Sequence, residues 1–249
     1  MRKMGRVGPM GKMGRVRKMG RVVRVGRGLV LLLFVLSSAS ARSVPLALSV
    51  PPDLLVQVKP KRPFPPQDLG LLEGPDRDAW QRPDQVMDAL GIGEGSVVAD
   101  LGAGGGWFTI RLARRVGPHG IVYAEDIQTP MLDAIGRRVQ REGLTNVRPV
   151  LGTGDDPKLP RNLDVILIVG TYHEMDNPVA LLQNAAPSLK PQGRLGVVDF
   201  TMGGGGPGPA RDERVDPEQV IKAAATAGLR LLKRESVLPF QYLLVFGKS

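Results

Sequence analysis

The sequence VVADLGAGGG, residues 97–106, decides the fold: an apolar run ends in an acid and is followed by alternating glycines. The apolar run predicts a buried strand, and the glycines predict a tight turn that leads into a helix at 107–116. In parallel α/β sheets ligands bind beyond the carboxyl ends of the strands, so we expect this turn to face a binding crevice. Glycines at such a turn let the backbone approach a ligand and leave N–H groups free at the start of the helix.

The spacing of the glycines separates two classes of nucleotide-binding domain. In a dinucleotide-binding turn, Gly-x-Gly-x-x-Gly, the third glycine would fall at Trp107, which is too bulky for close packing of helix on strand. Asp100 stands two residues before Gly102, where a carboxylate would repel a pyrophosphate but attract the ammonium of an amino-acid-bearing cofactor. We therefore expect Asp100, Gly102, Gly104 and Gly106 to bind such a cofactor. An NAD(P)-dependent oxidoreductase is the alternative, and the chain has no Tyr-x-x-x-Lys pair to support it.

Two further acids are candidates for cofactor contacts. A carboxylate at the end of the second strand, about 20 residues beyond the glycines, can accept both hydroxyls of a ribose. Strand alternation sends Glu125 and Asp126 to opposite faces, and we favour Asp126 because it lies nearer the strand end. Asp155, after the third strand, could reach an adenine amino group, and a plain acidic turn is the competing interpretation.

Helices and strands alternate at short spacing from Asp76 onwards, as is typical of an α/β domain with a mainly parallel sheet. The predicted helices span 77–90 with a break at Pro83, 107–116, 130–142, 178–189 and 217–227. The predicted strands span 96–101, 121–127, 147–151, 163–170, 194–200, 230–237 and 240–246, and the last two form a hairpin through Pro239.

At these residues the chain resembles the class I S-adenosylmethionine-dependent methyltransferases. Residues 97–108 look like the family's first motif, 121–127 like its acidic second strand, 164–174 like its fourth-strand motif and 241–246 like its last strand. The resemblance covers about residues 76–249. It implies a Rossmann-like three-layer sandwich whose seven-stranded, mostly parallel sheet has an antiparallel last strand, with S-adenosyl-L-methionine as cofactor. The family often has an acid where this chain has Thr153, so the adenine contact is expected at Asp155 or at a backbone group.

The implied reaction, an in-line displacement at a methyl group, needs alignment, exclusion of water and, for a protonated acceptor, a base. Tyr172 and His173, which follow the fourth strand, are the catalytic candidates; the competing interpretation is that they only cover the cofactor and bond to nearby backbone. Asp199, at the end of the fifth strand, could face the cleft, and we favour a structural cap or a solvated acid. Trp80 could close the pocket as a lid, and packing against the sheet edge is the competing interpretation. A non-catalytic domain that binds the cofactor is a further alternative, because a fold does not fix a function.

The charge of the chain is concentrated at its start. The formal net charge is +10, but residues 1–41 hold ten Lys and Arg and no acid, which leaves residues 42–249 neutral. Neutrality argues against a nucleic-acid partner, so we expect a small-molecule or protein acceptor. The chain has no cysteine and only two histidines, His119 and His173, so we expect no metal site.

The segment before the domain is predicted to be a leader and a linker. Residues 1–41 combine a basic low-complexity tract, the apolar run 29–36 and the small residues Ala39-Ser40-Ala41, a pattern typical of a signal peptide cleaved after Ala41. Export, for example to a periplasm, would follow; organelle targeting, or a cytoplasmic location if the leader does not function, are the alternatives. The apolar run is too short for a stable membrane span. Residues 42–75 carry eight prolines and are expected to form an extended linker to the methyltransferase domain at 76–249.

Overall fold

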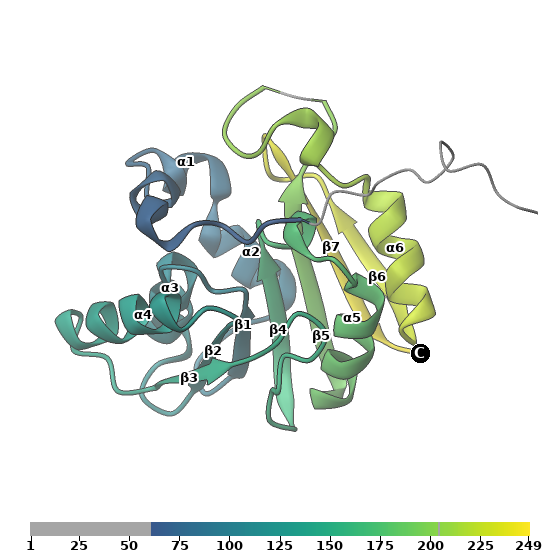
Figure 1. The fold of residues 1–249 in the computed structure, drawn as a ribbon. Helices are drawn as coiled ribbons and strands as arrows, with labels where there is room; N and C mark the ends of the chain where they lie inside the picture. Colours follow the sequence, from purple (N-terminus) through teal and green to yellow (C-terminus); the bar gives the residue numbers. More distant parts are fainter. Residues whose placement is uncertain (1–60, 204) are drawn as a thin grey trace, which may run out of the picture. The chain divides into compact units, whose positions relative to one another are not determined.

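A seven-stranded sheet in the order β3-β2-β1-β4-β5-β7-β6 organises the protein, whose computed structural model describes residues 61–203 and 205–249 (Figure 1). Strands β1 to β5 pair in parallel, and β7 is antiparallel to both β5 and β6. The sheet confirms the predicted fold class, including the antiparallel last strand. The strands are β1 (Val97–Leu101), β2 (Ile121–Asp126), β3 (Val147–Leu151), β4 (Leu163–Val169), β5 (Leu189–Phe200), β6 (Leu229–Glu235) and β7 (Gln241–Lys248).

Helices cover both faces of this sheet and make three layers (Figure 1). Helices α2, α3 and α4 pack on one face, and α5 and α6 pack on the other. The expected helix at 77–90 breaks before Pro83 as predicted, because a proline has no N–H for a continuous helix. The helices are α1 (Arg77–Gln81), α2 (Pro83–Leu90), α3 (Trp107–Val116), α4 (Thr129–Arg141), α5 (Pro178–Ala185) and α6 (Pro217–Thr226), with short 3-10 helices η2 (Pro66–Leu72), η3 (Tyr172–Glu174), η4 (Ala186–Ser188) and η5 (Arg211–Glu213).

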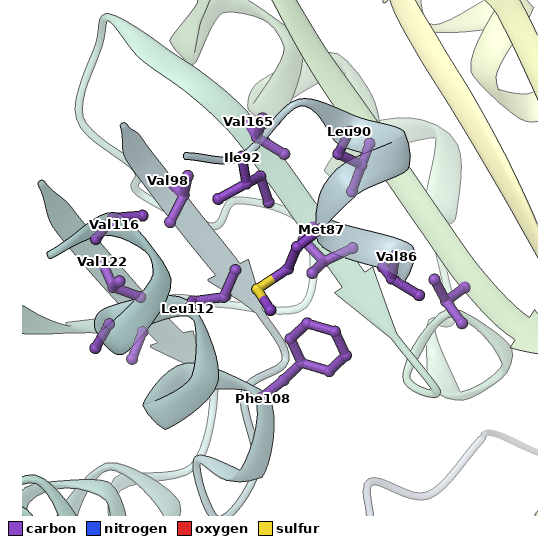
Figure 2. Close-up of a cluster of buried hydrophobic side chains, with 14 of the residues drawn as sticks. Val86, Met87, Leu90, Ile92, Val98, Phe108, Leu112, Val116, Val122 and Val165 are labelled. Carbon is purple, nitrogen blue, oxygen red and sulfur yellow. The ribbon is translucent and has the colours of Figure 1, made fainter. Parts of the chain in front are cut away.

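The alternation of side chains along the strands builds one apolar core on each face of the sheet. On the first face, apolar side chains of α2 and α3 meet valines of the central strands (Figure 2). On the other face, Ala99 and Leu101 of β1 belong to the core under α5 and α6. The residues labelled in Figure 2 are Val86, Met87, Leu90, Ile92, Val98, Phe108, Leu112, Val116, Val122 and Val165.

One element differs clearly from its predicted bounds. Strand β5 begins at Leu189, five residues before the predicted start, while helix α5 ends at Ala185 rather than at 189. Pro187 explains the early end of the helix, because its ring removes a hydrogen bond and the chain tightens into η4. Pro191 and Gly193, which are rare inside strands, concealed the first part of β5 in the sequence.

The second half of the proline-rich segment is docked on the domain, where an extended linker was expected. The Lys61 N–H donates to Asp176 Oδ1 (3.0 Å), and the Phe64 N–H donates to Glu174 Oε2 (2.9 Å). Gln128 Nε2 donates to the Phe64 carbonyl (3.0 Å). The rest of the linker, 42–60, and the predicted leader, 1–41, lie outside the described residues. Within the described ranges, no helix has the length and apolar character that a membrane crossing requires.

Candidate functional site

The glycine turn leaves the end of β1 in a conformation that only glycine adopts easily. Gly102, Gly104 and Gly106 have φ values of +71°, +54° and +78°. A Cβ atom at Gly102 would lie 2.3 Å from Cγ2 of Thr171, and Thr171 Oγ1 donates to the Gly102 carbonyl (3.0 Å). The turn therefore rests directly on the segment that follows β4, which carries Tyr172.

The two acids at the end of β2 hold the glycine turn from opposite faces of the strand. Asp126 Oδ2 accepts from the Gly104 N–H (2.9 Å), and its Oδ1 accepts from the Gln128 N–H (2.9 Å). Glu125 Oε2 accepts from the Gly102 N–H (3.2 Å), whereas its buried Oε1 has no hydrogen-bond partner among the described residues. Both acids are buried, and Glu125, which the sequence did not favour, bonds to the glycine turn as Asp126 does.

Burial dominates the protonation of these acids. It raises the pKa of Glu125 to about 8 and the pKa of Asp100 to about 6, and it raises the pKa of Asp126 as well. Asp100 lies on the α3 face of the sheet and accepts a hydrogen bond from Thr109 Oγ1 at 2.6 Å. The sequence placed Asp100 at the crevice, and the structure places it beneath the first turn of α3.

Arg77 is a site residue that sequence reasoning missed. Its guanidinium carbon lies 4.2 Å from the centre of the Trp107 ring, and Nη1 donates to the Leu72 carbonyl. Burial lowers the pKa of Arg77 to about 10, partly offset by the negative charge of Asp100. A half-buried cation thus stands beside the buried carboxylate at the start of α3. No motif in the sequence signals this contact, because Arg77 lies in helix α1, 23 positions before Asp100 of strand β1.

Helix η2 covers the glycine turn with apolar side chains. A Cβ atom at Gly104 would find only Leu72 Cδ1 within 4 Å, at 3.7 Å, and one at Gly105 would lie 3.0 Å from Leu69 Cδ2. Glu73, just after η2, forms an ion pair with Arg138 of α4. The turn is therefore approached at Gly104 and Gly105 by the side chains of Leu69, Leu72 and Glu73 and not by backbone.

The two catalytic candidates have different environments. Tyr172 is buried in the core on the α5 and α6 face, and burial raises the pKa of its hydroxyl to about 12. The ring of His173 is 10% exposed, and its Nδ1 lies 3.1 Å and 3.2 Å from the two carboxylate oxygens of Asp199. Asp199, which was interpreted as a cap or a solvated acid, is fully buried at the end of β5.

Asp155 was predicted to contact the cofactor, but it makes no hydrogen bond to the glycine turn or to the acids of β1 and β2 within the described ranges. Its side chain is exposed, and its backbone carbonyl accepts from Asn184 Nδ2 (2.9 Å) of α5. The turn itself is closed by hydrogen bonds between Thr153 and Asp156. The described ranges contain no cluster of three or more His, Asp or Glu side chains that could hold a metal ion.

The donors and acceptors of the site fit S-adenosyl-L-methionine, the cofactor that the resemblance implies. The observation that carries this fit is the glycine turn, which only side chains approach at Gly104 and Gly105: Leu72 at the former, Leu69 and Glu73 at the latter. Carboxylates stand at the ends of β1 and β2, and the half-buried Arg77 stands beside Asp100. These groups match a ligand with an ammonium, a carboxylate and a ribose.

Comparison with known proteins agrees with this fit. Residues 98–193 match the family model described as a methyltransferase domain. A crystal structure of an S-adenosylmethionine-dependent methyltransferase from Aquifex aeolicus superposes with a TM-score of 0.71 at 28% identity, covering 75% of this chain and all of that one.

Two curated relatives match over part of their length. A nocamycin O-methyltransferase from Saccharothrix syringae is 32% identical over 114 residues, which are 45% of this chain and 41% of that protein. A ubiquinone/menaquinone biosynthesis C-methyltransferase from Pasteurella multocida is 32% identical over 124 residues, 49% of this chain and 46% of that protein. The chain thus spans less than half the length of these two relatives. The family model, the solved structure and the geometry of the glycine turn lead to one conclusion: residues 98–193 form a methyltransferase domain similar to those of S-adenosylmethionine-dependent methyltransferases.

Proposed function

We propose that this protein transfers the methyl group of S-adenosyl-L-methionine to a small-molecule acceptor. The observation that carries the proposal is the glycine turn between β1 and α3, held by Glu125 and Asp126 from the end of β2. The two curated relatives are named for nocamycin and for ubiquinone/menaquinone biosynthesis, which supports a small-molecule acceptor over a protein side chain. Neither comparison supports the NAD(P)-dependent alternative.

Different residues of the site bind different parts of the cofactor. Asp100 and Arg77 carry opposite charges beside the glycine turn, as the ammonium and the carboxylate of the cofactor's amino-acid end require. Asp126 offers a carboxylate to the ribose hydroxyls, and Leu69 and Leu72 exclude water from above the turn. When bound, the cofactor supplies an electrophilic methyl group on a sulfonium that leaves as a neutral thioether.

Calorimetric titration tests cofactor binding directly. The wild-type protein is expected to bind S-adenosyl-L-methionine and not NADH. Asp126→Asn should weaken binding about 10- to 100-fold, because a hydrogen bond to a charged group contributes about 1.5–3 kcal/mol. Asp133→Asn, an exposed position on α4, is the matched control and should bind like the wild type. Binding of NADH alone, or of neither ligand, would refute the proposal.

Turnover separates an enzyme from a non-catalytic binding domain. The protein is incubated with S-adenosyl-L-methionine carrying a radioactive methyl group and with low-molecular-weight or protein fractions of a cell extract. We expect label in the low-molecular-weight fraction. Label in the protein fraction would refute a small-molecule acceptor, and tight cofactor binding without any transfer would favour the non-catalytic alternative.

The cover of the glycine turn gives a kinetic prediction. The double variant Leu69→Ala, Leu72→Ala removes the side chains above Gly104 and Gly105 and should speed dissociation of the cofactor about tenfold or more. Stopped-flow displacement measures the dissociation rate. Leu71→Ala is the control, because the Leu71 side chain is 79% exposed. An unchanged rate in the double variant would mean that η2 does not cover the bound cofactor.

For the beginning of the chain, we propose a secretory leader that is cleaved after Ala41 and exports the protein. The proposal is supported by the basic tract, the apolar run and the Ala39-Ser40-Ala41 pattern. N-terminal sequencing of the protein from its native cell is the test. A mature chain that begins at Arg42 is the expected result, and one that begins near Met1 would contradict cleavage.

A further inference from the structure

His173 and Asp199 meet because their strands are neighbours. Strands β4 and β5 pair in parallel with Val169 opposite Val198, and the Gly170 N–H donates to the Val198 carbonyl (2.8 Å). The residues just beyond this pair, η3 on one strand and Asp199 on the other, therefore lie side by side at the carboxyl edge of the sheet. This is the edge at which the glycine turn and the acids of β1 and β2 lie.

The hydrogen bonds of Asp199 determine which nitrogen of His173 carries a proton. Asp199 Oδ2 accepts from the His173 backbone N–H (3.0 Å), and Oδ1 accepts from the Phe200 N–H (2.7 Å). The carboxylate faces Nδ1 of the ring as a further acceptor at 3.1 Å and 3.2 Å. An acceptor on this side requires a proton on Nδ1, so the neutral ring presents its free lone pair at Nε2.

Nε2 makes no hydrogen bond to any described residue. Its charged neighbour, Glu174 Oε1, is 3.8 Å away, beyond hydrogen-bond distance. The groups that act on the ring are Asp199 from β5, Glu174 from η3 and Lys61 from the N-terminal segment. Burial lowers the pKa of His173, but Asp199 and Glu174 outweigh burial and raise that pKa above its usual value of 6.5. The imidazole is thus suited to take up a proton near neutral pH.

Two aromatic side chains, Phe200 and Trp80, extend from His173 in a row of ring contacts. The Phe200 ring lies edge-on to the imidazole, with ring centres 6.4 Å apart, and the Trp80 ring lies 6.2 Å from Phe200. Trp80 belongs to α1, so this helix reaches the end of β5. Such a row of rings favours a flat ring by stacking and apolar contact.

We propose that Nε2 of His173 takes the proton of a hydroxyl on an aromatic ring, and that Asp199 is a positioning residue that holds the imidazole in its reactive tautomer. The inference deepens the proposed function and rests on it. In the step, the O–H bond breaks and its proton goes to Nε2. An electron pair of the oxygen forms the bond to the methyl carbon, and the pair of the broken carbon–sulfur bond stays on sulfur. The imidazolium later returns its proton to water. A phenolic hydroxyl has a pKa of about 10, which is low enough for an imidazole to remove its proton as the methyl group is transferred.

The tautomer can be measured on the wild-type protein without any acceptor. Long-range nitrogen–proton NMR spectra of the imidazoles will contain two ring systems, and His119→Gln identifies the signal of the exposed His119. We expect His173 to be protonated at Nδ1 when neutral and to titrate above pH 6.5. Asp199→Asn should lower the midpoint by about one pH unit or more. An Nε2–H tautomer, or a midpoint that Asp199→Asn leaves unchanged, would overturn the role of Asp199.

Kinetics with defined probes test the base and the acceptor class. Catechol, 2-naphthol and caffeic acid are the aromatic probes, and cyclohexanol is the aliphatic control. We expect methylation of at least one aromatic probe and not of cyclohexanol, with kcat rising as His173 loses its proton. His173→Gln should lower kcat about 10²- to 10⁴-fold. Asp199→Asn should move the inflection of the pH profile to lower pH, and Asp199→Glu should recover part of kcat.

The failure of this inference can be told apart from failure of the proposed function by calorimetry on the same variants. His173→Gln should bind S-adenosyl-L-methionine as the wild type does. If the wild type does not bind the cofactor, the proposed function fails. If it binds the cofactor but methylates no aromatic probe, or if His173→Gln keeps the wild-type kcat, only the inference fails.

Discussion

Glu125 should make the protein less stable as the pH rises, and replacing it with glutamine should remove this effect. Burial raises the pKa of Glu125 from 4.5 to about 8, and the side chain is only 1% exposed. Between these pH values the folded protein keeps a proton that the unfolded chain has released. The free energy of unfolding therefore falls as the pH rises through this window.

The size of the effect follows from the same pKa. One pKa unit corresponds to about 1.4 kcal/mol, so the loss approaches about 5 kcal/mol once the pH exceeds 8. Such a loss is a large share of the stability of a typical domain, about 5–15 kcal/mol. Glutamine is always neutral and keeps an oxygen that can accept from the Gly102 N–H, so Glu125→Gln should match the wild type at pH 5 and exceed it at pH 9.

Urea unfolding of the cofactor-free protein at pH 5, 7 and 9, followed by tryptophan fluorescence, measures this difference. Asp100, whose pKa of about 6 acts in the same direction, is present in both proteins and cancels in the comparison. Glu94→Gln, at an exposed position, should follow the wild type at every pH. Parallel pH dependences of wild type and Glu125→Gln would show that the Glu125 carboxyl is not held neutral by burial.

Three further substitutions test the fold around the site. Gly102→Ala should lower the free energy of unfolding, measured in urea, by about 2–5 kcal/mol, because a Cβ in this left-handed backbone would collide with Thr171. Gly136→Ala in α4 is the control and should raise the free energy of unfolding by about 0.5–1 kcal/mol. Asn146→Ala should lower the free energy of unfolding by about 1–3 kcal/mol, because Asn146 Nδ2 donates to the carbonyls of Ala113 and Gly117, each at 2.8 Å. The same substitution should speed amide hydrogen exchange at the end of α3. Trp80→Ala should leave the calorimetric affinity for S-adenosyl-L-methionine unchanged and lower acceptor turnover, because Trp80 packs on Phe200; weaker cofactor binding would instead support the lid over the cofactor.

The fold and the cofactor turn could be predicted from the sequence because their signals are local. An apolar run, an acid and glycines at fixed spacing lie within ten consecutive residues, 97–106, and each constrains the backbone where it stands. The same holds for Pro83, at which the predicted break in the helix at 77–90 occurs and α2 begins. Periodicity and capping are properties of neighbours in the chain, so a single sequence contains them.

Only the tertiary structure decided which distant residues come into contact at the carboxyl edge of the sheet. Glu125 reaches Gly102 across 23 residues and His173 reaches Asp199 across 26, and both contacts depend on which strands are paired and in which register. Residues 61–75 were expected to be an extended linker for a related reason: their prolines disfavour α-helix and central strand, but they exclude neither the 3-10 helix η2 nor docking by backbone hydrogen bonds. The glycine turn within residues 97–106 can therefore be predicted from the sequence alone. The contacts that η2 and the acids of β1 and β2 make with this turn depend on how distant parts of the chain pack in the folded protein.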